Sequence, residues 1–168
     1  MTEANATVVA AVVGVLGLII GALVSFWASL YSERNKESIA TTREQLKYVF
    51  APLEILLRMN KREFDRYFQK DTTQEDRIFI EKNVWYANNV QIKLILMEKS
   101  HLLTVVPDVL LDLLTHINVW LSEYQQIYVE GTKKPPVFGG PKGYGYPSQV
   151  DDYVYSECKK LRSRVNMK

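Results

Sequence analysis

The longest apolar segment of the chain lies at its N-terminus. From Ala6 to Leu30 the sequence reads ATVVAAVVGVLGLIIGALVSFWASL and contains no charged side chain. A single α-helix needs roughly 20 apolar residues to cross the hydrocarbon core of a bilayer. The pattern therefore predicts a transmembrane helix over residues 6–31, with Trp27 and Tyr31 at a depth where aromatic side chains favour the headgroup layer.

A cleaved signal peptide is the alternative interpretation of this segment. Signal peptides have a basic n-region, an apolar core of roughly 7–15 residues and a cleavage site of small residues. The chain begins MTEANAT, without Lys or Arg, and its apolar run is longer and ends in bulky residues. We therefore expect a retained membrane anchor.

Beyond the anchor, apolar residues recur at spacings of three and four, which is the period of one helix face. Residues 32–45 are polar and compatible with a helix, and they predict a stalk. Apolar stripes follow over residues 46–68, 78–97, 109–128 and 150–165. The predicted fold class is all-α, with one N-terminal transmembrane helix, a stalk over 32–45 and a cytoplasmic helical domain over 46–168 that forms a four- or five-helix bundle.

Several residues predict where these helices begin and end. Pro52 should kink its helix or start a new one, because proline removes a backbone donor. Thr73, with an acid three residues later at Asp76, predicts a capped helix start. Asn83 and its neighbours indicate a break within the following helix. Gly131 is placed to end the helix over 109–128.

The charges on either side of the anchor predict its orientation. No Lys or Arg precedes the apolar run, whereas several follow it closely (Arg34, Lys36, Arg43 and Lys47). Because basic flanks stay on the cytoplasmic side, we expect a single-pass protein of the inner (plasma) membrane with its N-terminus outside. The single cysteine, Cys158, agrees with a reducing compartment. A formal net charge of +2 does not favour a dedicated nucleic-acid binder.

Small residues in the membrane segment fall on two helical series. One has heptad-like spacing (Ala10, Gly14, Gly17, Gly21, Ala28) and the other has strict i, i+4 spacing (Gly17, Gly21, Ser25, Ser29). Small side chains allow neighbouring membrane helices to approach closely. We therefore predict a homo-oligomer with helix–helix contacts at Ala10, Gly14, Gly17, Gly21 and Ser25.

Two contact faces fit a ring, in which each protomer has two neighbours. A ring of this composition would enclose an apolar pore, which can gate by dewetting. The alternative is a plain anchor, because glycine is generally more frequent in membrane helices than in soluble ones.

Enzyme motifs are scarce in this sequence. It contains no GxxxxGK[ST] loop, no HExxH and no pair of cysteines with metal spacing. His116 is expected to be a helix-surface or core histidine, His101 is expected to cap a helix or face solvent, and Cys158 lies on the apolar stripe of the last helix. The sequence therefore predicts no enzyme, no catalytic residue, no cofactor, no metal and no small-molecule substrate.

Two polar segments are candidate contact surfaces. The loop over residues 132–147, TKKPPVFGGPKGYGYP, is a connection or a docking surface. The C-terminal segment KKLRSRVNMK is basic, and lipid headgroups or RNA phosphates are the expected contacts of Lys159, Lys160, Arg162 and Arg164. The alternative role of these cations is to complement the helix dipole.

The order of these segments resembles a group of small bacterial membrane proteins linked to antiphage defence. The resemblance covers the whole layout: a membrane helix, a stalk, QLKYVFAPLEILL, VPDVLLDLL and a glycine-proline loop leading through YPSQVDDYV to a last helix. The layout of this chain is similar to that of the membrane accessory proteins of RNA-targeting (type VI) CRISPR systems. The resemblance implies an oligomeric membrane pore that acts beside an RNA-guided effector or another defence protein.

The cytoplasmic domain also resembles the HEPN group of helical folds. Catalytic HEPN ribonucleases are marked by an arginine four to six residues before a histidine. No arginine stands at that distance before His101 or His116, so we do not expect RNA cleavage by that mechanism. The expected function is a non-enzymatic membrane protein that self-associates and perturbs or gates the membrane. The alternative is a membrane-anchored scaffold or sensor that recruits a cytoplasmic partner.

Overall fold

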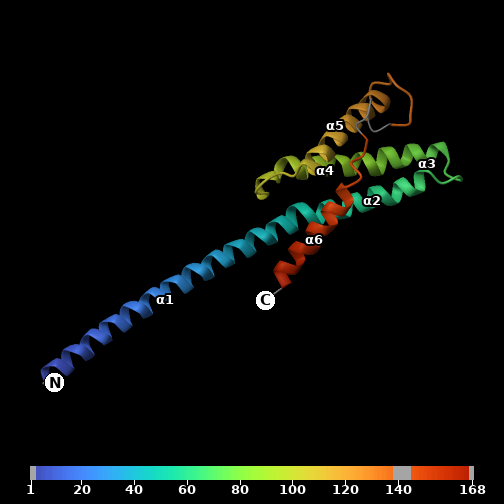
Figure 1. Cartoon of the computed structure of the whole chain (residues 1–168). Helices are drawn as coiled ribbons and strands as arrows, with labels where there is room; N and C mark the ends of the chain where they lie inside the picture. Colours follow the sequence, from blue (N-terminus) through green and yellow to red (C-terminus); the bar gives the residue numbers. More distant parts are fainter. Residues whose placement is uncertain (1–2, 138–144, 167–168) are drawn as a thin grey trace. The chain divides into compact units, whose positions relative to one another are not determined.

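The computed structural model of the chain describes residues 3–137 and 145–166 (Figure 1), with the side chains of residue 14 and of residues 16 onward in those ranges. Every regular element in these ranges is a helix, and they contain no strand. The predicted all-α class is therefore confirmed. By its internal contacts the chain divides into two compact units, residues 1–40 and 41–168, which are described separately below.

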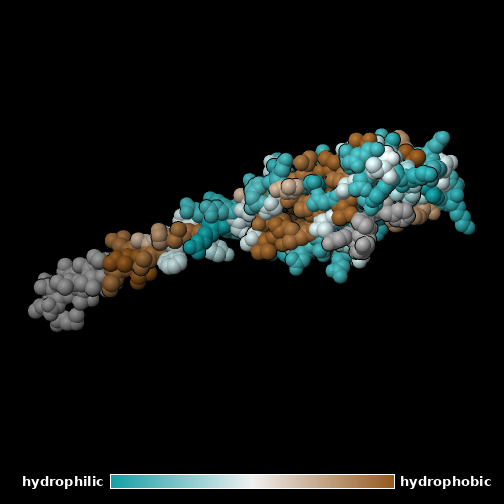
Figure 2. Space-filling model, turned by 90° about the horizontal axis from the view of Figure 1, so that it is seen from above, coloured by the Kyte–Doolittle hydropathy of each residue, from teal (hydrophilic) through white to brown (hydrophobic). Residues whose placement is uncertain are grey.

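The described part of the first unit belongs to α1 (Glu3–Gln45), whose last five residues belong to the second unit. From Leu16 to Ser29 every side chain is exposed, and Figure 2 shows this apolar stretch followed by hydrophilic residues. Among the described residues, one helical stretch is long and apolar enough to cross a membrane, and none of its most apolar window is buried. A core helix of a soluble protein can be equally long and apolar, but it would be mostly buried. A signal sequence near the N-terminus can also have this length and composition.

A π-helical turn, η1 (Leu46–Phe50), precedes α2 (Ala51–Tyr67). The N–H of Ala51 donates to the carbonyl of Leu46, five residues back, as in a π-turn. Pro52 then lies in the first turn of α2, and because helical backbone precedes it, its missing N–H leaves one carbonyl of the preceding turn without a helical donor. A new α-helix does start at this proline, as predicted, but the backbone stays helical across the junction.

The helix after the 68–73 turn starts at the predicted cap. The Asp76 N–H donates to Thr73 Oγ1 (3.1 Å) and the Thr73 N–H donates to Asp76 Oδ2 (3.2 Å), so α3 (Gln74–Phe79) begins with a capping box. The break expected near Asn83 is a second π-helical segment, η2 (Ile80–Trp85), which leads into α4 (Tyr86–Glu98). The Asn83 side chain donates to the carbonyl of Phe79 (3.1 Å).

A short 3-10 turn, η3 (Ser100–Leu102), joins α4 to α5 (Asp108–Tyr128). Gly131 follows α5 with a φ of +66°, a left-handed conformation that glycine adopts without a Cβ clash, and this confirms the predicted helix end. The last helix is α6 (Val150–Asn166). In the second unit α4 packs against α2 and α5, and α6 packs against η1, α2 and α5 (Figure 1).

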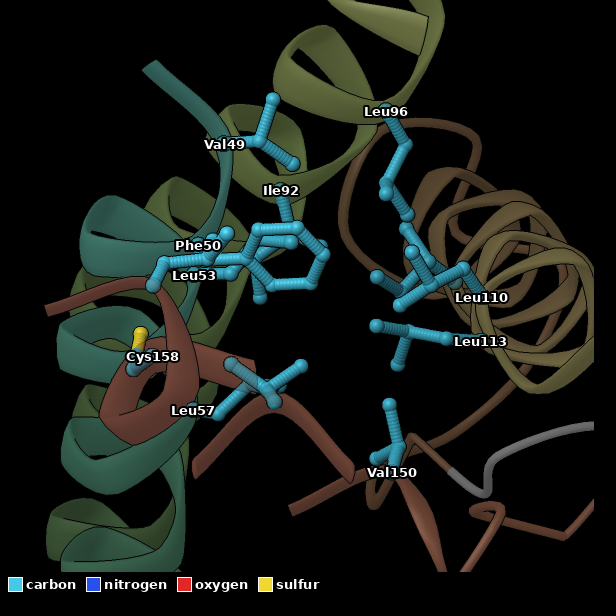
Figure 3. Packing of buried hydrophobic residues seen from close by; sticks show 13 residues of the cluster. Val49, Phe50, Leu53, Leu57, Ile92, Leu96, Leu110, Leu113, Val150 and Cys158 are labelled. Atoms are coloured by element: carbon cyan, nitrogen blue, oxygen red, sulfur yellow. The ribbon is translucent and has the colours of Figure 1, made fainter. Parts of the chain in front are cut away.

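The main hydrophobic core lies where these helices meet. Its buried side chains come from five elements, namely η1, α2, α4, α5 and α6, and Figure 3 shows among them Leu53 of α2, Ile92 of α4, Leu113 of α5 and Cys158 of α6. Cys158 is 0% exposed, and burial, followed by its hydrogen bond to a glutamate, raises the pKa of its thiol to about 12. The expectation that Cys158 is a packing residue is therefore confirmed.

Candidate functional site

The predicted helix–helix contact residues lie on the exposed stretch of α1. A Cβ atom built on Gly14, Gly17 or Gly21 would meet no heavy atom within 4 Å, and Ser25 is exposed. The side chain of Ala10 lies outside the described residues. A glycine in a helix interior costs about 0.5–1 kcal/mol relative to alanine. Within the described chain, no close approach of another group requires a glycine at these three positions.

The four basic residues of α6 have different surroundings. Arg162 forms an ion pair with Glu54 of α2 (2.8 Å), and Lys160 forms one with Glu157 (3.0 Å). Lys159 and Arg164 are exposed, and neither has an ion-pair partner in the described part of the chain. Of the predicted contacts to lipid headgroups or RNA phosphates, Lys159 and Arg164 are therefore the ones whose charge is not already neutralised by this chain.

The Glu54 carboxylate ties α6 to α2. Glu54 is 8% exposed; its Oε1 forms an ion pair with Arg58 (2.8 Å) and its Oε2 accepts a hydrogen bond from Arg162 (2.8 Å). Burial by itself would raise the pKa of this carboxyl. The hydrogen bonds from Arg162 and Cys158 and the two guanidinium charges outweigh burial and hold the pKa of Glu54 below its ordinary value.

This lowered pKa predicts an acid-dependent loss of stability. A carboxylate whose pKa is depressed by folding stabilises the native state above its unfolded pKa, and that contribution is lost as pH falls through the folded pKa. We expect Arg162→Gln to lower the free energy of unfolding by about 1–2 kcal/mol near neutral pH, since one partner of the pair is half-exposed. The difference in the free energy of unfolding between Arg162→Gln and wild type should shrink as the pH falls toward about 3. Thermal unfolding measured from neutral pH to about pH 3 tests this.

Lys160→Gln is the matched control for this prediction. It removes the ion pair with Glu157 on the same helix, but this pair is more exposed, so its effect should stay within about 0.5 kcal/mol. An Arg162→Gln variant as stable as wild type at neutral pH would show that the link between α2 and α6 contributes nothing.

A buried carboxylate of η2, Glu81, joins four segments of the second unit. Glu81 is 1% exposed. Its oxygens accept from the Tyr67 hydroxyl of α2 (2.8 Å), from the Tyr128 hydroxyl of α5 (2.6 Å) and from the Val137 N–H of the following loop (3.2 Å to each oxygen). Buried polar groups are stable only when they are hydrogen-bonded, so this side chain fixes the start of the loop to the helices.

Two cations lie over the tyrosines that donate to Glu81. The Arg77 guanidinium is 5.4 Å from the ring centroid of Tyr67, and Lys82 Nζ is 4.6 Å from that of Tyr128. Burial, and then the hydrogen bond to Glu81, raises the pKa of both tyrosine hydroxyls well above its ordinary value. Both hydroxyls therefore remain neutral donors at physiological pH.

A cavity of about 900 Å³ opens beside this network. Arg77, Tyr67 and Val137 line one side of it, and tryptophans, phenylalanines, asparagines and Tyr146 line much of the rest. The His116 ring also faces it, edge-on to Tyr146 with ring centroids 5.6 Å apart. In the described ranges, no group of three or more metal-ligating side chains is placed to hold a metal ion.

The remaining candidates from the sequence are His101 and the loop over residues 132–147. His101 is exposed, and its Nδ1 lies 2.9 Å from the carbonyl of Glu98, at the end of α4, as expected for a residue that caps a helix or faces solvent. In the loop over 132–147, residues 138–144 lie outside the described residues, so the docking surface predicted there stays a prediction. The side chain of Val137 at the start of this loop is buried against Trp120 and Ile127.

Sequence reasoning missed Glu81 and the cavity. One signal was available, because Glu81 falls between Ile78 and Trp85 at spacings of three and four, so an acid stands on the apolar face of its helix. A charged residue at such a position is almost never buried without partners. Its donors, Tyr128 and Val137, are 47 and 56 residues away in the chain, and no local pattern pairs them.

Comparison with known proteins returns no match for this chain among protein-family models, curated proteins or solved structures.

Proposed function

We propose that this chain is a non-enzymatic single-pass membrane protein that self-associates through α1 and perturbs or gates the membrane. Its N-terminus would lie outside and its second unit in the cytoplasm. The observation that carries this proposal is the exposed apolar stretch of α1, with three glycines that no contact within the described chain explains. Small residues at such positions favour close helix association in lipid.

The role in bacterial antiphage defence is part of this proposal and rests on the resemblance in layout. A pore that depolarises the cell needs no catalytic site, which agrees with the scarcity of enzyme motifs in the sequence. An RNA-guided effector or another defence protein is the proposed partner of the second unit.

A membrane-anchored sensor or scaffold is the second candidate function. The observation that favours it is the cavity of the second unit, together with the loop that Glu81 holds beside it. Under this alternative, α1 provides only attachment, and its exact sequence should not matter.

Replacing residues 6–30 by a polyleucine helix separates the two functions. Polyleucine keeps the apolar length but removes every small residue, so helices can no longer approach closely. If α1 builds a membrane-active assembly, the swap should abolish the activity of the protein in cells while expression and membrane localisation persist. Full activity of the polyleucine chain would favour the anchored sensor and would contradict the assembly.

A further inference from the structure

We infer that the cavity of the second unit is a ligand site for an aromatic anion, meaning a planar ring that carries a carboxylate or phosphate group. This inference goes beyond the proposed membrane function and does not depend on it. The observations that lead to it are a buried donor in the cavity wall without an acceptor, a guanidinium without an ion-pair partner in the described ranges and a set of aromatic side chains. All of them come from described residues of one unit.

One donor in the cavity wall lacks an acceptor. Arg77 Nε is fully buried and has no hydrogen-bond partner in the described part of the chain. Buried donors without acceptors are costly and uncommon in folded proteins. A ligand that brings an acceptor oxygen into the cavity would satisfy this donor.

The Arg77 guanidinium is the feature of the cavity that favours an anion. Lys61 and Asp65 are both exposed and stand one helical turn apart on α2, so their charges offset each other. The Asp151 carboxylate, also in the lining, accepts from the Tyr146 hydroxyl (3.0 Å). Arg77 is left without a carboxylate partner in the described ranges, and a guanidinium binds carboxylate or phosphate through paired hydrogen bonds.

Aromatic side chains supply the surfaces that a planar ring needs. Trp85, Trp120 and Phe64 belong to the lining, and Trp85 stacks on Tyr67 with centroids 5.0 Å apart. Aromatic rings bind other rings by offset or edge-on packing. A volume of about 900 Å³ is in the range of sites that bury most of a drug-sized ligand.

The test is a binding titration on the full chain in a neutral detergent. The chain has three tryptophans, Trp27, Trp85 and Trp120, so a Trp27→Phe background confines the fluorescence signal to the two in the cavity wall. The probes are 2-naphthoate, the matched cation 2-naphthylmethylammonium and the non-aromatic anion cyclohexanecarboxylate. We expect saturable quenching by 2-naphthoate alone, and we expect Arg77→Gln to weaken its binding by about tenfold to a hundredfold.

Arg62→Gln is the matched control, because Arg62 is an exposed arginine of α2 that does not line the cavity. It should leave 2-naphthoate binding unchanged. Arg77→Lys keeps the charge but loses Nε, so its affinity for 2-naphthoate should fall between those of Arg62→Gln and Arg77→Gln. Equal binding by Arg77→Gln, preferential binding of the cation or no saturable binding of 2-naphthoate would each overturn the inference. A cooperative thermal unfolding transition for each variant shows that it is folded. The titration measures ligand binding directly, so its result does not depend on whether the chain depolarises membranes.

Discussion

Leucine in place of both Gly17 and Gly21 is expected to break the membrane assembly. Both positions accept a larger side chain within the described chain, because an added Cβ at either would meet nothing within 4 Å. The folded protein should therefore keep its stability, while the added side chains hold neighbouring helices apart. Size-exclusion chromatography with light scattering in a mild detergent should show a shift from oligomer to monomer, with at least a tenfold loss of association.

The matched control adds volume on the other side of the same helix. Successive residues are about 100° apart around an α-helix, so Ile19 and Leu23 lie roughly opposite Gly17 and Gly21. Ile19→Phe with Leu23→Phe should leave the oligomer intact. If the Gly17→Leu/Gly21→Leu protein keeps its oligomer size, the small-residue faces are not the contact surface.

The second large effect is expected at Glu81. Glu81→Leu removes the shared acceptor of the Tyr67 hydroxyl, the Tyr128 hydroxyl and the Val137 N–H, and each buried donor left without a partner costs about 1–3 kcal/mol. We expect a loss of about 3–5 kcal/mol in the free energy of unfolding and a fall in Tm of about 10 °C or more. Thermal unfolding followed by circular dichroism measures it.

Two other substitutions give this prediction its scale. Glu81→Gln keeps one acceptor oxygen, so its free energy of unfolding should fall between those of wild type and Glu81→Leu. Glu98→Gln, at an exposed position near the end of α4, should change stability by about 0.5 kcal/mol or less. A Glu81→Leu protein that unfolds within a few degrees of wild type would contradict the structural role of the network.

Local signals in the sequence predicted the helices well. The stripe over 150–165 predicted the buried face of α6, where Val150, Val154, Cys158 and Leu161 are all buried, and the cap at Thr73 and the helix end at Gly131 were also read correctly. These features depend on residues within a few positions of one another, so their chemistry is visible in the sequence.

The two π-helical segments, η1 and η2, were not predicted as such. Pro52 and Asn83 indicated interruptions, but a π-turn keeps the backbone helical and changes only the hydrogen-bond register. The candidate sites were harder still. Arg162 was predicted as a phosphate or lipid contact, and its pairing with Glu54 joins residues 108 apart in the chain, which only tertiary structure reveals.

The cavity is the clearest case of a feature beyond the reach of the sequence. Its wall combines Arg77 of α3, Asn89 of α4 and Tyr146 of the loop before α6, and no spacing rule links such residues. The glycines of α1 are the opposite case, because their helical spacing alone pointed to a contact surface. The contacts proposed for these glycines would be made with other copies of the chain, so membrane experiments test that proposal.

Membrane polarisation in cells that express the chain tests the central claim most directly. A potential-sensitive dye would be read in cells with the wild-type protein, the Gly17→Leu/Gly21→Leu variant and the Ile19→Phe/Leu23→Phe control at matched expression, with and without phage challenge. We predict depolarisation by the wild type and the control and its absence in the glycine variant. An unchanged potential with the wild-type protein under both conditions, or equal depolarisation by the glycine variant, would contradict a membrane-active assembly built on α1.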